Sequence, residues 1–409
     1  MYLAHMKILH TADWHIGKIL HKQSLAEEMQ MFLDWLLATL QKEQVDLLLI
    51  SGDIFDVANP ASKDREVYYQ FLSKLIQHNI RTIITGGNHD SIAVLNAPSV
   101  LLDHMGITVV GGATESITDE VIQIKNQKGK LEAIVAAVPF LRDKDLRKID
   151  PDKKQDRRIA IREGMKKHYQ LISDHCEKYS DQVPVIAMGH LYAKGATVSD
   201  SERDIGNQSA IQADIFTEVF DYVALGHIHS PQIVAKNKNI RYSGSPIALS
   251  FSEKKDEKSV CLIETKGNTI KNITLVPIPK QRKLTLISGQ YEEVAKQLAS
   301  YTTDSKLPDF VELRVKAKIF SHSLIANVEA LISEYGDQLD FTILRHSFEF
   351  EENSKQVTDF FENNIKIEEM KPVDIFKTKL SAEETLEEDK KQTLISLFEE
   401  VLVDIQQNE

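Results

Sequence analysis

Residues 80–93 read IRTIITGGNHDSIA, and this stretch decides how the rest of the chain is interpreted. Its first six residues form a short apolar run, which is typical of a strand buried on both faces of a sheet. Two glycines end the run, and an asparagine and a histidine follow at once. A turn has a use for the glycines, because they allow tight backbone geometry, but it has no need of the histidine. The stretch therefore predicts a buried strand that delivers functional side chains at its end.

The same pattern recurs along the first 280 residues. Short runs rich in Val, Ile and Leu alternate with segments whose apolar residues have helical spacing. This alternation predicts a layered α/β architecture. The other runs are residues 7–10, 45–51, 132–139, 183–189 and 221–226, and two of the helical segments are residues 25–43 and 63–79.

The pattern changes near residue 280. VPIPKQRK (276–283) contains two prolines and a basic cluster, which is typical of a linker. From Ser381 the sequence begins with a capping box, SAEE, and continues with an apolar stripe at helical spacing. We expect three parts: residues 1–280, a small α+β part at 281–378 and a helical segment at 379–409. The small part has predicted strands at 283–287, 309–317 and 339–350 and predicted helices at 291–301 and 323–336.

Composition narrows the class of protein. The 409 residues are 42% hydrophobic and suit two or three domains rather than a disordered chain. No apolar stretch approaches 18 residues and no secretory signal is evident, so we expect neither a membrane span nor secretion. The two cysteines, Cys176 and Cys261, have no metal-binding spacing and fit a reducing cytoplasm. The net charge of −12 argues against a protein that coats nucleic acid, although residues 142–168 carry 11 basic and 6 acidic side chains.

Polar residues of three kinds follow five of the six apolar runs. Ligands of open α/β sheets bind beyond the carboxyl ends of the strands, so we expect these side chains to converge. One such residue alone is usually a turn or cap residue, but turn chemistry does not account for five recurrences. The residues that follow the runs are Asp13, His15, Asp53, Asn88, His89, His190, His227 and His229.

The chemistry of this set predicts a metal centre. Carboxylate, amide oxygen and imidazole without thiolate suit Mn²⁺, Fe or Zn²⁺ better than Ca²⁺ or a structural zinc. Seven ligands from these eight residues would already exceed the need of one ion. Two ions roughly 3.5–4 Å apart that share a carboxylate would use them, and such a pair activates water and holds both oxygens of an in-line phosphoryl displacement.

The order D-x-H, G-D, G-N-H, H and G-H-x-H resembles that of the calcineurin-like metallophosphoesterases. Longer strings support the resemblance: ILHTADWHIGK, SGDIFDVANP, GGNHDSIAVLNAPS, VPFLRDKDLR, GHLYAKGA, ALGHIHSPQ and YSGSPIALSFSE. Together they are similar to the nuclease subunits of bacterial complexes that process DNA ends, over nearly the whole chain. The resemblance implies an α/β/β/α metallophosphoesterase fold, a small capping domain and a C-terminal helical segment.

The resemblance also implies a role for each residue. Asp13, His15 and His229 would hold the first metal ion and Asp53 would bridge the two. The second ion would be held by Asn88, His190 and His227. His89 would be catalytic, standing over the phosphate as general acid or electrostatic stabiliser. We expect two divalent ions, Mn²⁺ before Mg²⁺.

Three residues close in sequence to the predicted ligands each have two possible interpretations. Asp56 stands where archaeal and eukaryotic relatives have an active-site histidine, and it either supports a ligand or is a plain loop residue. Trp14 either stacks on a nucleotide or packs on the sheet. Asp90 orients His89 or caps the following helix, and capping is favoured.

The implied function is a metal-dependent DNA nuclease: a 3′→5′ exonuclease on double strands and an endonuclease on single strands and hairpins. The chain has no G-x-x-x-x-G-K-[ST] motif, so we do not expect it to bind ATP in a P-loop. The resemblance implies a separate coiled-coil ATPase, and the C-terminal helix would either dock on that ATPase or pack on its own domain. The resemblance also implies a homodimer within a heterotetramer. Residues 62–78 and 91–104 are the candidate interface of the homodimer. We expect a cytoplasmic, nucleoid-associated protein, with residues 142–168 as a DNA contact.

Two other functions compete with this interpretation. One is a phosphatase or small-substrate phosphodiesterase of the same family. Its protein-phosphatase branch expects arginine after the G-D-x-x-D motif, where this chain has Val57. The other is a scaffold that has lost the chemistry, against which the complete set of ligands and His89 argues.

Overall fold

The computed structural model describes residues 5–146, 157–193, 196–197, 211–318, 322–336 and 340–350, with 380, 390–391, 393–395 and 397–398. The chain divides into two compact units, one of residues 1–315 and 325–347 and one of residues 316–324 and 348–409. The two large sheets and the candidate site belong to the first unit. No helix within the described residues is long and apolar enough to cross a membrane.

Two six-stranded sheets form the body of the first unit. The first has the order β14–β13–β1–β4–β5–β6 and the second the order β11–β12–β10–β9–β8–β7. The bounds in the first sheet are β1 Lys7–Thr11, β4 Leu47–Ser51, β5 Arg81–Thr85, β6 Ile107–Val110, β13 Ser259–Lys266 and β14 Thr269–Pro277. Those in the second are β7 Val121–Lys125, β8 Leu131–Ala137, β9 Val185–His190, β10 Tyr222–Gly226, β11 Gln232–Val234 and β12 Asn237–Tyr242. All six apolar runs that predicted strands are strands.

The six predicted strands divide between the two sheets, three to each. β1, β4 and β5 are parallel neighbours in the first sheet, and β8, β9 and β10 are parallel neighbours in the second. Parallel strands end on the same side of a sheet, so the residues that follow them share an edge.

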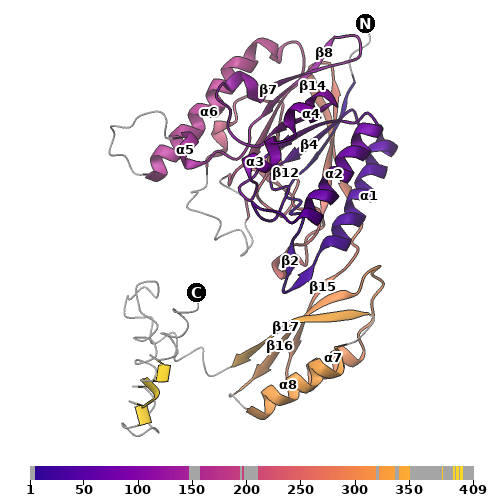
Figure 1. Ribbon diagram of the computed structural model, residues 1–409, viewed down its shortest axis with the longest axis vertical. Coiled ribbons are helices and arrows are strands. Elements are labelled where there is room, and N and C mark those ends of the chain that lie inside the picture. Colours follow the sequence, from indigo (N-terminus) through magenta and orange to yellow (C-terminus); the bar gives the residue numbers. More distant parts are fainter. Residues whose placement is uncertain are drawn as a thin grey trace. The chain divides into compact units, whose positions relative to one another are not determined.

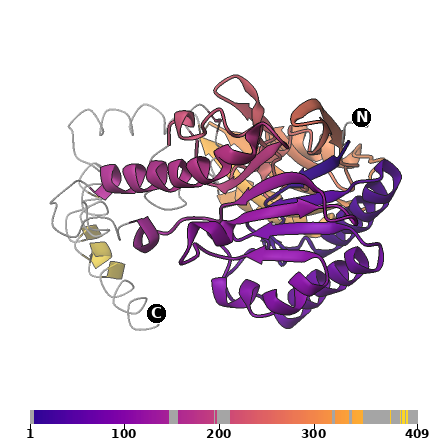
Figure 2. The same cartoon turned by 90° about the horizontal axis from the view of Figure 1, so that it is seen from above.

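Helices cover the outer face of each sheet (Figures 1 and 2). Helices α1 (Ala26–Glu43) and α2 (Ser62–Gln77) pack on the first sheet, and α6 (Arg157–Ser180) packs on the second. A third apolar cluster fills the space between the sheets. In β4, Leu47 and Leu49 enter this middle cluster while Leu48 and Ile50 meet the helices. A strand with two buried faces reads as a continuous apolar run, and the α/β/β/α layering is confirmed.

The chain has further elements outside these two sheets. A smaller sheet has the order β15–β16–β17, with β15 and β16 parallel. The strand–helix–strand–helix–strand pattern expected after residue 283 is therefore present, while the boundaries at 280 and 378 stay a prediction. The C-terminal segment 379–409 lies largely outside the described residues. The bounds are β2 Ile19–Leu20, β3 Gln23–Ser24, α3 Ile92–Asn96, α4 Ser99–His104, η1 Ile117–Glu120, α5 Asp143–Leu146, η3 Ala213–Ile215, η4 Phe251–Glu253, β15 Leu284–Gly289, α7 Tyr291–Ala299, β16 Asp309–Ala317, α8 His322–Glu334 and β17 Phe341–Phe350.

Candidate metal centre

The loops that follow β1, β4, β5, β9 and β10 meet at one place, and they bring together all eight predicted residues. Contacts join the two sheets there. The main-chain N–H of His227 donates to Asp13 Oδ1 over 2.8 Å. His190 Nε2 lies 3.2 Å from Asp53 Oδ2, and the rings of His15 and His229 are 5.0 Å apart.

Sharp backbone turns aim these side chains. Asp13, His15 and Asp53 have φ angles of 54°, 47° and 49°, and His227 has 101°. Such values are uncommon in non-glycine residues and cost on the order of 1–3 kcal/mol each. Four residues of one site share the strain, which indicates that the fold maintains it for function.

The side-chain atoms of His190 show what the site is built to hold. Its Nδ1 lies 3.0 Å from the carbonyl oxygen of Ser51, which can only accept, so Nδ1 is the donor. The neutral ring then has a lone pair on Nε2, which faces Asn88 Oδ1 at 2.9 Å and Asp53 Oδ2 at 3.2 Å. Three electron-rich atoms gathered in this way are stable only around a cation or a proton.

Unpaired buried atoms support the same conclusion. Asp13 is fully buried and His15 is 2% exposed. Among the described residues, Asp13 Oδ2 and His15 Nε2 are buried atoms without a hydrogen-bond partner. Leaving such atoms unpaired costs about 1–3 kcal/mol each, and a bound metal ion would pair both of them. The donor set therefore fits a divalent metal.

Electrostatics suit the same role. Burial, together with the neighbouring His190, lowers the pKa of His227 to about 3, so this ring is neutral at pH 7 and able to ligate a metal. Burial also opposes a charge on His190, but the Asp53 and Asp13 carboxylates outweigh it and raise the pKa of His190 to about 9. A proton on His190 thus occupies the place of a cation among the carboxylates, and metal binding would release it.

The two glycines of residues 80–93 are required by space rather than by a turn. A β-carbon on Gly87 would collide with the carboxylate and the main-chain nitrogen of Asp53. One on Gly86 would collide with the main chain of Gly111. Neither glycine is among the positive-φ residues. The glycines therefore let the loop approach the candidate metal centre closely, and the turn that was expected of them does not use the left-handed conformation that favours glycine.

Comparison with known proteins agrees with this geometry. The family model described as calcineurin-like phosphoesterase matches residues 6–231. The D subunit of the SbcCD nuclease of Escherichia coli (strain K12) is 32% identical over 96% of this chain and 97% of its own length. The proteins of the same name from Rhodobacter capsulatus and Bacillus subtilis (strain 168) are 31% and 35% identical, over 74% and 64% of this chain and 77% and 66% of theirs.

The chain belongs to the SbcD family of calcineurin-like phosphoesterases. It is a metal-dependent phosphodiesterase and a nuclease subunit. The resemblance found in the sequence is confirmed, and with it the fold class.

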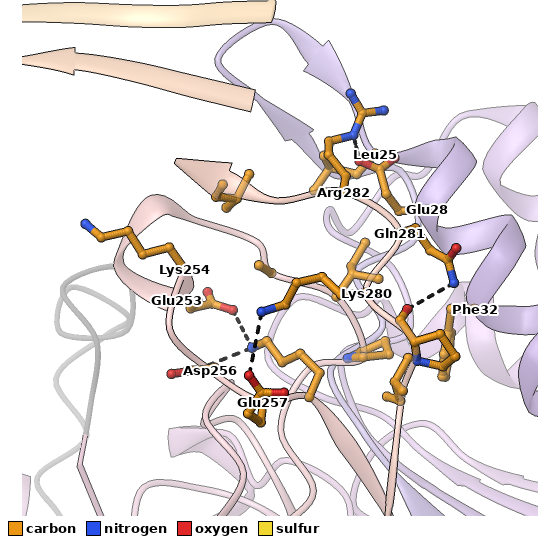
Figure 3. A pocket seen from close by; sticks show the side chains of 17 residues that line it. Leu25, Glu28, Phe32, Glu253, Lys254, Asp256, Glu257, Lys280, Gln281 and Arg282 are labelled. Carbon is orange, nitrogen blue, oxygen red and sulfur yellow. Dashed lines mark hydrogen bonds and ion pairs between the residues drawn. The ribbon is translucent and has the colours of Figure 1, made fainter. Parts of the chain in front are cut away.

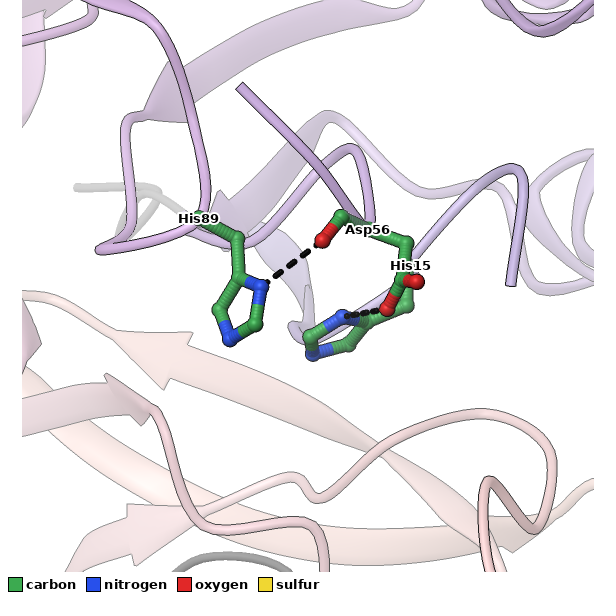
Figure 4. Close-up of side chains that lie close together, drawn as sticks. All are labelled: His15, Asp56 and His89. Atoms are coloured by element: carbon green, nitrogen blue, oxygen red, sulfur yellow. Dashed lines mark hydrogen bonds and ion pairs between the residues drawn. The ribbon is translucent and has the colours of Figure 1, made fainter. Parts of the chain in front are cut away.

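Within this SbcD site, Asp56 connects two histidines (Figure 4). Its carboxylate Oδ1 accepts from His15 Nδ1 over 3.0 Å and from Lys18 Nζ over 3.1 Å. Its main-chain oxygen accepts from His89 Nδ1 over 2.7 Å. His15, Asp56 and His89 could themselves hold an ion, but the carboxylate already has two donors. Asp56 supports His15 and His89, and the interpretation as a plain loop residue is wrong.

Trp14 is buried between the first sheet and the helices α1 and α2. It is fully buried, its ring meets Phe32 and Phe71 edge-on at 5.9 and 5.5 Å, and Nε1 donates to Thr11 Oγ1 over 3.1 Å. A side chain without exposed surface cannot stack on a nucleotide. Of the two interpretations that the sequence left open, packing is confirmed.

Asp90 does not cap the next helix, so that expectation is wrong. Ser91 is the N-cap residue of α3. The buried Asp90 carboxylate instead accepts from three main-chain N–H groups, those of Ile54, Phe55 and Gly87, at 3.1, 3.0 and 2.8 Å. It therefore joins the loop of Asp53 to the loop of Asn88.

Sequence reasoning missed the residues that support the ligands. Lys18 lies beside Asp56, and Glu253 lies beside His229. The only signal for Glu253 was its place at the end of the string YSGSPIALSFSE, which gives no role to any single residue.

Proposed function

We propose that this chain is a two-metal DNA nuclease. The observation that carries the proposal is the buried group of Asp13, Asp53 and His190, whose candidate ligand atoms all lie within 4.8 Å of one another. Around it, His15 comes from the same loop as Asp13, and the other ligands approach from the loops that follow β5 and β10.

Two ions divide the ligands. Asp13, His15 and His229 would hold the first, Asp53 would contribute to both, and Asn88, His190 and His227 would hold the second. In support, Asn88 Oδ1 lies 2.9 Å from His190 Nε2 and 3.0 Å from His227 Nδ1. Mixed oxygen and nitrogen ligands without thiolate suit Mn²⁺, with Mg²⁺ as the alternative. When bound, such a pair supplies an activated water and neutralises charge on the phosphate.

His89 acts on the substrate rather than on the metal. Its Nδ1 donates to the Asp56 carbonyl over 2.7 Å, and its ring lies 4.8 Å from that of His15. The hydrogen bond directs Nε2 away from Asp56, where the ring can stabilise charge on the phosphate and donate a proton to the leaving oxygen.

The substrate is DNA and the partner is an SbcC-like coiled-coil ATPase. The relatives are named as the D subunits of SbcCD nucleases, which supports a complex of this kind. The complex would act on the nucleoid in the cytoplasm. The activities are those of an ATP-dependent complex: 3′→5′ cutting of double strands and endonucleolytic cutting of single strands and hairpins. Residues 281–378 cap the nuclease domain of residues 1–280, and residues 379–409 dock on the ATPase.

The DNA contact is the basic stretch 142–168. Within its described part, Arg162, Lys166 and Lys167 of α6 are exposed. Phosphates would attract these side chains, and binding would weaken as salt rises. Residues 147–156 of the stretch lie outside the described residues.

A homodimer forms through α2 and the two short helices α3 and α4, within a heterotetramer. Apolar side chains on these helices and just after α4 are exposed: Tyr69 by 38%, Val100 by 76%, Leu101 by 59% and Met105 by 46%. A second copy of the chain would cover such side chains.

The test is cleavage of a labelled DNA hairpin with Mn²⁺ by the wild type and His89→Ala. The main-chain N–H of His89, which donates to Asp53 Oδ1 over 2.9 Å, remains in the variant, so the metal ligands keep their places. We expect cleavage to fall by about 10²–10⁴-fold, with Mn²⁺ affinity unchanged. Equal cleavage by both proteins would refute the proposed role of His89. If the wild type does not cleave DNA even with its ATPase present, the proposed nuclease function is refuted.

A further inference from the structure

Glu253 is a buried carboxylate behind the metal centre. It is 2% exposed and lies on the short 3₁₀ turn η4. Oε1 accepts from His229 Nδ1 over 3.2 Å, and Oε2 accepts from Lys258 Nζ over 2.7 Å and from Ser245 Oγ over 3.2 Å. The carboxylate thus faces an ammonium group and an imidazole in a buried position.

The ammonium group of Lys258 also contacts His229. Besides Glu253, Nζ donates to the main-chain oxygen of His229 over 2.9 Å and to Ser245 Oγ over 2.9 Å. The side chain of Lys258 is 6% exposed. Glu253 and Lys258 therefore hold His229 by its ring and by its backbone.

Stability alone does not explain such a pair. The cost of removing both charges from water roughly cancels their attraction, so a buried ion pair is on average no better than a well-packed apolar pair. The pair forms one wall of a pocket that Glu28, Lys254 and Arg282 also line (Figure 3). On its other side the Glu253–Lys258 pair contacts His229, and this contact suggests a function for the pair.

The turn that carries Glu253 is itself fixed in place. Phe251, two residues earlier, is buried in an apolar cluster with Leu20, Leu25 and Phe310. An acceptor on a fixed turn can orient a ring, whereas one on a mobile loop cannot.

We propose that Glu253 is a positioning residue that keeps His229 in the tautomer with hydrogen on Nδ1, so that Nε2 presents its lone pair to the metal, while Lys258 compensates the charge of Glu253. The proposal rests on the metal centre proposed above. A carboxylate that accepts from a ligating imidazole fixes the ring and raises its basicity. Asp56 stands in the same relation to His15, and the Ser51 carbonyl to His190.

The test compares two double variants, Glu253→Gln/Lys258→Met and Glu253→Ala/Lys258→Met. Both remove both charges, so neither leaves a charge buried without a partner. Only the first retains an oxygen that accepts from Nδ1. The readout is Mn²⁺ binding to metal-free protein without DNA, with free Mn²⁺ measured by its EPR signal.

We expect the alanine variant to bind one Mn²⁺ about 10–100-fold more weakly than the wild type, and the glutamine variant to stay within a few-fold. Equal affinities in the two variants, whether unchanged or equally weakened, would overturn the proposal. If the wild type binds no Mn²⁺, the metal centre itself fails, which is a separate outcome.

A second measurement does not depend on the folding of these variants. In metal-free wild type with ¹⁵N-labelled histidine, the His229 ring signals, assigned by their loss in His229→Gln, should show hydrogen on Nδ1. Hydrogen on Nε2 would overturn the proposal.

Discussion

Replacing Gly87 with alanine tests whether the loop of Asn88 and the carboxylate of Asp53 are held against each other without spare room. A β-carbon there would lie 2.7 Å from Asp53 Cγ and nearer still to Oδ1 and the main-chain nitrogen. The carboxylate cannot retreat easily, because His89 N–H donates to Oδ1 over 2.9 Å and His190 Nε2 lies 3.2 Å from Oδ2. Overpacking of this kind lowers the free energy of unfolding by about 1–3 kcal/mol.

The assay is urea unfolding in EDTA, followed by Mn²⁺ titration of the folded protein. We expect the Gly87→Ala variant to unfold at lower urea and to bind Mn²⁺ more weakly, because Asp53 must move. Gly336→Ala is the matched control. A β-carbon at Gly336 has its nearest neighbour, the Ser333 carbonyl oxygen, at 3.4 Å, an ordinary contact. That change should alter stability by less than about 1 kcal/mol and leave Mn²⁺ binding unchanged. Wild-type unfolding and Mn²⁺ affinity in Gly87→Ala would refute the reasoning.

Three further predictions concern the metal, a buried histidine and the buried tryptophan. Mn²⁺ at 100 times its Kd should stabilise metal-free protein by about 2.7 kcal/mol per ion, as measured by urea unfolding; Asp53→Asn should lose most of this gain, and an equal gain would place the ions elsewhere. Burial lowers the pKa of His10 from 6.5 to about 3. Below pH 6.5 the unfolded chain therefore binds a proton that the native state does not, and the protein loses about 2 kcal/mol of stability by pH 5. Urea unfolding of His10→Gln should show a correspondingly smaller loss of stability between pH 7 and pH 5. An equal loss in the variant would show that His10 contributes nothing to the pH dependence. Trp14→Phe should lower the free energy of unfolding by about 1–3 kcal/mol and leave DNA affinity unchanged. Reduced DNA affinity at unchanged stability would show that Trp14 contacts the substrate instead.

The six strands that were predicted in the two large sheets, β1, β4, β5, β8, β9 and β10, were predictable because their signal is local. Each apolar run, such as residues 45–51 or 221–226, is complete within a few residues. Which strand belongs to which of the two sheets was not predictable from the runs, because β4 and β10 are buried on both faces and their sequences do not say which neighbours they have. The strand β14 was not predicted for the opposite reason: its side chains are all exposed or half-buried, so it lacks a continuous apolar run.

The eight site residues were predictable by type and place, and the residues behind them were not. A histidine after a buried strand is conspicuous wherever the chain then goes. Glu253 and His229 are 24 positions apart, and Asp56 and His15 are 41 apart. Their pairing is decided by how the loops fold over the strand ends, and no spacing rule records that.

Asp90 shows why local rules fail at this site. Next to Ser91 and α3 its type suggests a cap, and an isolated helix would use it so. The turn at Asp53, however, takes the chain out of the sheet with a φ of 49°. The N–H groups of Ile54 and Phe55 then need a new acceptor, and the Asp90 carboxylate provides it. The strained turn that aims the Asp53 carboxylate thus requires a second buried carboxylate behind it, and that requirement outweighs the weaker advantage of a helix cap.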